Sequence, residues 1–233
     1  MKKILVTGGN GRFANELKKI KSAYKFLFKN KKQLNILSPK SIEFNIGRYK
    51  PNIILHLAGL SRPMSVHDTD INKSIDLNII GTSNLVKSCN RNKIKIIFFS
   101  TSYVYPGKKG NYKEYNPLLP FNNYAWSKLG GECAVQMLKN SLILRICMTE
   151  KPFLYKYAYT NLKTNFMFHQ DLVKVFFKFI NKRGVINVGG PVQSVYNFAK
   201  KSSKNVKKKV LKPKKGTLPL ASTMNIRKFK KIN

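Results

Sequence analysis

The chain has 233 residues, with 45 Lys plus Arg against 9 Asp plus Glu and a formal net charge of +36. This length accommodates one main domain and a small additional lobe around a substantial core. No apolar stretch approaches the roughly 20 residues of a membrane span, so no membrane partner is expected. The three cysteines form no CxxC pair, which favours reduced thiols in a cytoplasmic protein without disulfides or a structural metal.

The positive charge would ordinarily indicate a nucleic-acid partner. It is spread along the chain, however, and Lys far outnumbers Arg beside abundant Asn, Ile, Phe and Tyr. Such a mix is typical of proteins encoded by AT-rich genomes. The densest run, Lys200 to Lys215, is interpreted as a solvated face or loop rather than a DNA contact. We therefore expect no nucleic-acid partner, although a positive field would attract phosphorylated ligands.

Apolar segments alternate with helical ones along the chain. This alternation predicts an α/β fold in which helices cover both faces of a parallel sheet. The predicted strands are Lys3 to Val6, Tyr24 to Phe28, Ile53 to Leu57, Ile94 to Phe99 and Leu142 to Ile146. The predicted helices are Arg12 to Ile20, Asn72 to Asn90, Asn123 to Asn140, Asp171 to Asn181 and Val195 to Ser202.

The first predicted strand leads into the glycine-rich run Thr7 to Gly11 and then into a helix that begins near Arg12. Glycines let the backbone turn tightly and approach a pyrophosphate, whose charge is met by the helix N-terminus. Ala14, at the third small position, still permits close packing of helix on strand. This arrangement at the start of the chain predicts a dinucleotide-binding site.

No acidic residue follows the second predicted strand, where Lys29, Lys31 and Lys32 cluster instead. An acid there would hold the ribose 2′-OH of NAD, whereas a cation accommodates the 2′-phosphate of NADP. We therefore expect NADP(H) to be the preferred cofactor, with NAD(H) as the alternative. The competing interpretation is ordinary surface charge in a very basic protein.

The fourth predicted strand ends in the hydroxyl residues Ser100, Thr101 and Ser102. Ligands of open parallel sheets bind outside the carboxyl ends of the strands. These hydroxyls are therefore expected to face the site that the glycine-rich loop opens. The alternative interpretation is that they only cap the strand.

Tyr124 and Lys128 lie four residues apart in the run YAWSKLGGE. On a helix this spacing puts the phenol and the ammonium on one face, about one turn apart. The spacing also occurs by chance in many proteins, as a packed Tyr beside a solvated Lys. Its interpretation as a catalytic pair therefore depends on the glycine-rich loop and the hydroxyl cluster.

We expect a nucleotide-binding domain at residues 1–148 and a small substrate-binding lobe at 149–233, interleaved with the last sheet elements. His169 and Asp171 look like a metal pair, but no third ligand is nearby. No metal site is therefore expected, and Asp171 is interpreted as a helix N-cap. The aromatic residues that could stack on a nucleotide base, or simply pack, are Phe153, Tyr155, Tyr157 and Tyr159.

The order of these motifs resembles the extended short-chain dehydrogenase/reductase family, also called the NAD-dependent epimerase/dehydratase superfamily, and most closely its dTDP-4-dehydrorhamnose reductase type. The likeness rests on TGGNGRFA, HLAG, DLNIIGTSNLV, STSYVY, YAWSKLGGE and NVGGP, and covers nearly the whole chain. It implies a Rossmann-type doubly wound sheet with a small C-terminal substrate lobe. It also implies an oxidoreductase that uses NAD(P)H to reduce a 4-keto (deoxy) nucleotide-sugar in polysaccharide or nucleotide-sugar biosynthesis.

The resemblance implies a role for each matching residue. Tyr124 would give a proton to the developing alkoxide, and Thr101 would hold the substrate oxygen. Lys128 would lower the pKa of the phenol and bind the nicotinamide ribose, while Asn78 would support Lys128. The residues placed at the cofactor are Gly8, Gly11, Arg12, Phe13, Asn35, Ile36, Ala58, Gly59, Asn78 and Lys128.

The sequence departs from the reductase type at two positions. Ser102 stands where STDYVF has Asp, and Asn35 replaces the Asp of LDIT. Sugar-nucleotide dehydratases usually carry Asp-Glu after the Thr, but here Ser102 and Tyr103 follow it. Neither supplies a carboxylate for elimination. An epimerase and a non-catalytic binding or regulatory relative remain as alternatives, and the oligomeric state stays open, a homodimer included.

Overall fold

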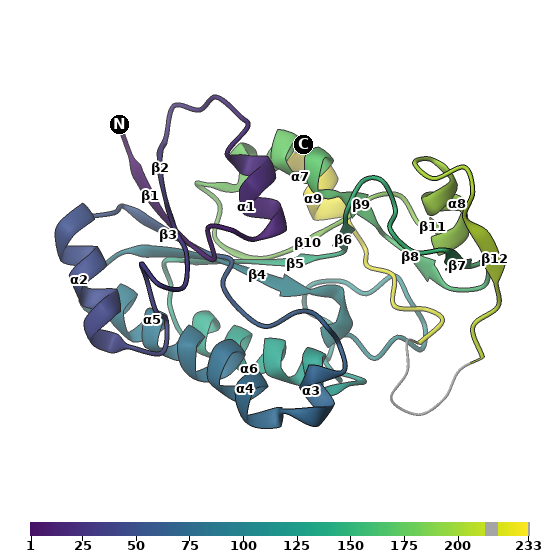
Figure 1. Ribbon diagram of the computed structural model, residues 1–233, viewed down its shortest axis with the longest axis horizontal. Coiled ribbons are helices and arrows are strands. Elements are labelled where there is room, and N and C mark those ends of the chain that lie inside the picture. The colour runs from purple at the N-terminus through teal and green to yellow at the C-terminus, as the bar shows by residue number, and fades with distance from the viewer. Residues whose placement is uncertain (213–218, 233) are drawn as a thin grey trace.

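In the computed structural model, which describes residues 1–212 and 219–232, six parallel strands form one central sheet (Figure 1). The strands are β1 (Lys3–Thr7), β2 (Lys25–Lys29), β3 (Ile53–His56), β4 (Lys95–Thr101), β5 (Ser141–Ile146) and β10 (Gly184–Val188). Their order across the sheet is β10-β5-β4-β3-β1-β2. The chain thus leaves β1 on one side and returns past it to β3. Such a switch point is where open α/β sheets bind ligands.

Helices cover both faces of this sheet (Figure 1). On one face lie α1 (Arg12–Leu17), α7 (His169–Phe176) and α9 (Arg227–Ile232), and on the other α2 (Pro39–Tyr49), α5 (Gly81–Arg91) and α6 (Asn123–Gln136). Successive strand residues point to opposite faces. Ile4 and Val6 therefore pack in the core beneath α1 and α7, and Leu5 packs beneath α2 and α5. The expected Rossmann-type doubly wound fold is confirmed.

The structure corrects several predicted elements. Helix α2 and strand β10 were not predicted, and α1 ends at Leu17 rather than Ile20. The segment predicted as one helix from Asn72 divides into α4 (Ile71–Ile75), a π-helical turn (Asp76–Ile80) and α5. The N-cap of α7 is Phe168, so Asp171 lies inside the first turn and its prediction as the N-cap is wrong. Short helical turns complete the set: α3 (Val66–Thr69), Ser102–Val104 and Phe177–Phe179.

A small lobe lies beyond the end of the sheet (Figure 1). It pairs β7 (Tyr157–Tyr159) with β12 (Lys207–Lys209) and β8 (Lys163–Thr164) with β11 (Gln193–Ser194), beside α8 (Val195–Lys200). β6 (Met148–Thr149) and β9 (Met167–Phe168) lead into it. The three lysines of β12 are exposed, and residues 213–215 of the predicted basic run lie outside the described residues. Within the described ranges, no helix is long and apolar enough to cross a membrane.

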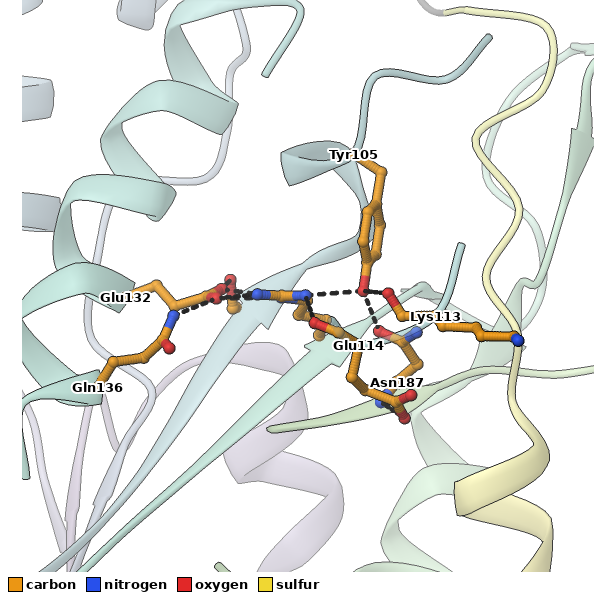
Figure 2. A network of polar contacts seen from close by, with 8 residues as sticks. Tyr105, Lys113, Glu114, Glu132, Gln136 and Asn187 are labelled. Carbon is orange, nitrogen blue, oxygen red and sulfur yellow. Dashed lines mark hydrogen bonds and ion pairs between the residues drawn. The ribbon is translucent and has the colours of Figure 1, made fainter. Parts of the chain in front are cut away.

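A buried polar network fixes α6 against the sheet (Figure 2). The Arg145 guanidinium on β5 donates to the Glu132 carboxylate on α6, with Nε to Oε1 at 3.0 Å, and the two side chains are 2% and 0% exposed. Ser100 at the end of β4 donates to the same carboxylate at 2.6 Å. On its other side Arg145 donates to the Tyr105 hydroxyl, which donates to Asn187 on β10. Three strands and α6 therefore meet at one ion pair.

Replacing Arg145 with Met should lower the free energy of unfolding by about 3–5 kcal/mol, because it leaves the buried Glu132 charge without its cation. The control is Arg91→Met, whose partner Glu43 forms an exposed pair and whose loss should cost about 1 kcal/mol or less. Denaturant unfolding of both variants measures the difference. Equal losses of unfolding free energy in the two variants would mean that the buried pair contributes no more to stability than a surface pair.

Candidate active site

A cavity of about 1470 Å³ opens at the carboxyl ends of the strands and continues into the small lobe. This volume exceeds that of a typical site for one small ligand, about 300–1,000 Å³. It therefore accommodates a dinucleotide together with a second ligand. The predicted site residues that line it are Gly8, Gly11, Arg12, Phe13, Asn35, Ile36, Ala58, Gly59, Thr101, Tyr124 and Lys128.

The glycine-rich loop follows β1 and lies against the loop after β3. Gly8 has φ +66°, and a Cβ there would lie 2.7 Å from the backbone N of Ala58. The backbone N of Gly9 donates to the carbonyl of Lys29 at 2.8 Å, which anchors the loop to the end of β2. A side chain at Gly8 is thus excluded by both conformation and space. The loop keeps its backbone open to the cavity, so the residues present fit a dinucleotide.

Thr7 and His56 join the glycine-rich loop to the helix behind it. Thr7 Oγ1 accepts hydrogen bonds from the backbone N–H groups of Leu57 and Ala58 at 3.2 and 3.1 Å, so its own proton points to His56 Nδ1 at 2.8 Å. We therefore assign the His56 proton to Nε2, which donates to Thr82 Oγ1 at 3.0 Å. Burial, and then the charge of Lys128, lowers the pKa of His56 to about 3. The ring is neutral at physiological pH.

Asn78, in the π-helical turn, continues this connection to α6. The Thr82 hydroxyl donates to the Asn78 carbonyl at 2.8 Å, and the Asn78 amide donates to Ser127 Oγ at 2.8 Å. The same side chain both accepts from and donates to the backbone of Leu60, at 2.8 and 2.9 Å. Asn78 is buried, it does not line the cavity, and its side-chain hydrogen bonds go to Leu60 and Ser127. None of these bonds reaches the Lys128 ammonium, so the expected support of Lys128 by Asn78 stays a prediction.

Tyr124 and Lys128 face the cavity from the first turns of α6, whose N-terminus is capped by the Asn122 side chain. Burial raises the pKa of Tyr124, while a hydrogen bond with Thr101 and the charges of Arg62 and Arg12 act to lower it. Burial lowers the pKa of Lys128 to about 7, against the opposing effect of Glu132. Lys128 is not among the groups that shift the pKa of Tyr124 here, so the expected lowering of the phenol pKa by Lys128 stays a prediction.

The three lysines at and after the end of β2, Lys29, Lys31 and Lys32, divide into two groups. Lys29 Nζ donates to the Tyr49 hydroxyl at 2.8 Å and lies 4.0 Å from the centroid of that ring. Lys31 and Lys32 are exposed and line the cavity beside Asn30. Lys31 and Lys32, rather than Lys29, are thus placed to meet a ligand phosphate.

The aromatic residues of the lobe also line the cavity. Phe153 is buried in the core of the lobe, whereas Tyr155 is 51% exposed and lies beneath the Arg62 guanidinium, 5.8 Å from the ring centroid. Sequence reasoning missed Arg62, Ser127 and Glu150. The Arg62–Glu150 pair joins residues 88 positions apart, and no local pattern in the sequence signals it.

The burial of Lys128 leads to a stability prediction. The folded chain releases the Lys128 proton near pH 7, and the unfolded chain near the ordinary pKa of 10.5. The unfolded state therefore binds more protons in this window, and the stability of the wild type rises with pH across it.

Lys128→Met removes this effect and should raise the free energy of unfolding at pH 7 by at least about 1 kcal/mol. The advantage should shrink toward pH 10, which denaturant unfolding at several pH values measures. Lys73→Met, at an exposed position on α4, is the control and should show no such trend. A destabilised Lys128→Met variant at pH 7 would contradict the assigned burial cost.

Comparisons with known proteins show which family and which fold this chain is similar to. The family described as "RmlD substrate binding domain" matches residues 1–173. The spore coat polysaccharide biosynthesis protein SpsK of Bacillus subtilis is 32% identical over 149 residues, which cover 62% of this chain and 52% of that protein. The methionine adenosyltransferase 2 subunit beta of Pongo abelii is 32% identical over 126 residues, which cover 53% and 35%. The chain thus spans about half, or less, of the length of these curated relatives.

Solved structures show the same fold over nearly the whole chain. The dTDP-4-dehydrorhamnose reductase of Bacillus anthracis, in complex with NADP, superposes with a TM-score of 0.85 at 23% identity and covers 99% of this chain and 91% of that one. A dTDP-4-dehydrorhamnose reductase of Clostridium acetobutylicum has the same TM-score at 21% identity, covering 96% and 90%. At these identities the likeness establishes the architecture.

Proposed function

This chain belongs to the RmlD substrate binding domain family, and from that premise we propose that it is an NADP(H)-dependent oxidoreductase of nucleotide-sugars. Its substrate is a 4-keto nucleotide-sugar, and the reaction reduces the ketone to an alcohol. The observation that carries the proposal is that Thr101, Tyr124 and Lys128 line one cavity together with the glycine-rich loop. The structural relative that is a dTDP-4-dehydrorhamnose reductase in complex with NADP supports it.

The bound cofactor would supply the hydride. Thr101 would hold the carbonyl oxygen, and the Tyr124 hydroxyl would give its proton to that oxygen as it becomes an alkoxide. The raised pKa of Tyr124 keeps the phenol protonated, which suits a proton donor. Lys128 would hydrogen-bond the nicotinamide ribose and return positive charge to the site when protonated. Ser102 and Tyr103 follow Thr101 and supply no carboxylate, which argues against dehydration of the sugar.

The small lobe would carry the nucleotide of the substrate, because the cavity continues past Tyr155 and Tyr157 into it. The three cysteines are free thiols, as a reducing cytoplasm maintains, and we place the reaction there. SpsK, named as a polysaccharide biosynthesis protein, supports a role in the supply of a sugar for polysaccharide.

A non-catalytic subunit is the second candidate function. Several curated relatives carry the name methionine adenosyltransferase 2 subunit beta, so this fold also serves as a subunit of another enzyme. The presence of Thr101, Tyr124 and Lys128 together in one cavity favours the reductase. Turnover of a sugar that depends on Tyr124 would exclude the subunit role as the sole function.

Tyr124→Phe should lower turnover about 100-fold or more, because only the proton-donating hydroxyl is lost. The measurement is NADPH oxidation with a panel of 4-keto nucleotide-sugars, and cofactor binding should be unchanged. Tyr115→Phe, which removes the hydroxyl of a 76% exposed residue, is the matched control and should retain wild-type turnover. Near-full activity of Tyr124→Phe with a turned-over substrate would contradict the catalytic assignment.

The double substitution of Lys31 and Lys32 by Ala should weaken NADPH binding by about 10-fold and leave NADH binding within about 2-fold. The lost interaction is with the 2′-phosphate, which NADH lacks. Calorimetry with each cofactor measures both affinities. Substituting Lys108 and Lys109 by Ala, at exposed positions away from the cavity, controls for the change in net charge. Equal losses for NADH and NADPH would refute the preference.

A further inference from the structure

Two arginines from distant parts of the chain converge on one carboxylate at the edge of the cavity. Arg12 is the first residue of α1, Arg62 lies in the loop after β3, and Glu150 follows β6. The Nη1 atoms of both guanidinium groups donate to Glu150 Oε1, that of Arg62 at 2.8 Å. The second carboxylate oxygen accepts from the Thr149 hydroxyl at 3.0 Å. One oxygen of the carboxylate thus binds the two arginines, and the Thr149 hydroxyl holds the other.

The arginines face the ligand cavity more openly than their partner does. Both line the cavity, with side chains 44% and 35% exposed, whereas the Glu150 side chain is 14% exposed. The charges of Arg62 and Arg12 both act to lower the pKa of Tyr124. Arg62 also lies over the ring of Tyr155. The pair is therefore situated between the glycine-rich loop, the catalytic Tyr and the aromatic residues of the lobe.

The charges at this point do not balance. Burial acts to raise the pKa of Glu150, but the hydrogen bond from Arg12 and the charges of both arginines lower it to about 2. The carboxylate is ionised at neutral pH, and one negative charge faces two positive ones. A guanidinium has five N–H donors, and Glu150 takes one from each arginine. The remaining N–H donors of the two arginines, and the one positive charge that Glu150 does not neutralise, suit an anion with two charged groups.

We propose that Arg12 and Arg62 form a binding site for the diphosphate of a nucleotide ligand, and that Glu150 competes with this diphosphate for both guanidinium groups. A diphosphate matches the fork of an arginine and brings a second negative charge, so it outcompetes a single carboxylate. Glu150 lowers the affinity for weaker anions and keeps the arginines positioned. The proposal rests on the proposed function only for the source of the diphosphate, which is the cofactor or the nucleotide-sugar.

The test compares binding to the wild type, Glu150→Gln and Arg62→Gln, each with NADPH and with thymidine diphosphate, at low salt. Glu150→Gln removes the competing carboxylate. It should therefore raise the affinity for the diphosphate ligand that uses the site by about 10-fold. Arg62→Gln should lower the affinity for the same ligand by about 10-fold. A change confined to NADPH identifies the cofactor as the source, and one confined to thymidine diphosphate identifies the nucleotide-sugar.

Glu43→Gln is the matched control, because Glu43 pairs with Arg91 on the surface and its loss changes the net charge by the same amount. It should leave both affinities within about 2-fold of wild type, since exposed charges at a distance are screened. Equal tightening by Glu43→Gln and Glu150→Gln would overturn the proposal, as would weaker binding of both ligands to Glu150→Gln. Because calorimetry reads binding alone, a chain that binds these ligands without turnover would refute the reductase and leave this site intact.

Discussion

A continuous path of buried hydrogen bonds joins β1, at the start of the glycine-rich loop, to helix α6, and the geometry of the candidate site depends on it. The path runs from Thr7 through the neutral ring of His56 to Thr82, then through the carbonyl and amide of Asn78 to Ser127. Each member is both donor and acceptor, so the direction of every proton is set by its neighbours. A partly satisfied buried network would be costly, and the complete one holds β1, the loop after β3 and helix α6 together.

The π-helical turn and the Glu132–Arg145 ion pair hold the two ends of this arrangement. In the turn at Asp76–Ile80, both the carbonyl and the side chain of Asn78 take part in the hydrogen-bond path. A regular α-helix would change the position of these two groups. Glu132 lies one turn after Lys128 on α6. Its carboxylate accepts hydrogen bonds from Ser100, the neighbour of Thr101, and from Arg145. The end of β4 and helix α6 are thus fixed to each other beneath the cavity that Thr101, Tyr124 and Lys128 line.

The sequence predicts those parts of the molecule that depend on local pattern. The glycine-rich loop, the hydroxyl residues at the end of β4, and the pair Tyr124 and Lys128 all line one cavity, because a strand end or the helix period sets the position of each. Helix α2 was missed although Ser38 caps it and Pro39 begins it, since Ile42 and Ile46 are its only buried apolar residues. The Arg62–Glu150 pair and the role of Ser127 depend on contacts between distant segments. Burial likewise sets the pKa of Lys128, which residue type alone does not reveal.

The measurement that tests the reductase most directly is the stoichiometry of NADPH oxidation with a 4-keto-6-deoxy nucleotide-sugar. A reductase consumes one reduced cofactor for each alcohol formed, whereas an epimerase or a dehydratase recovers its cofactor in every cycle. Following absorbance and product together, we expect NADPH loss to equal the reduced sugar formed, with no 4-keto product from an intact nucleotide-hexose. Conversion of the sugar without net oxidation of NADPH would contradict the account and favour an epimerase.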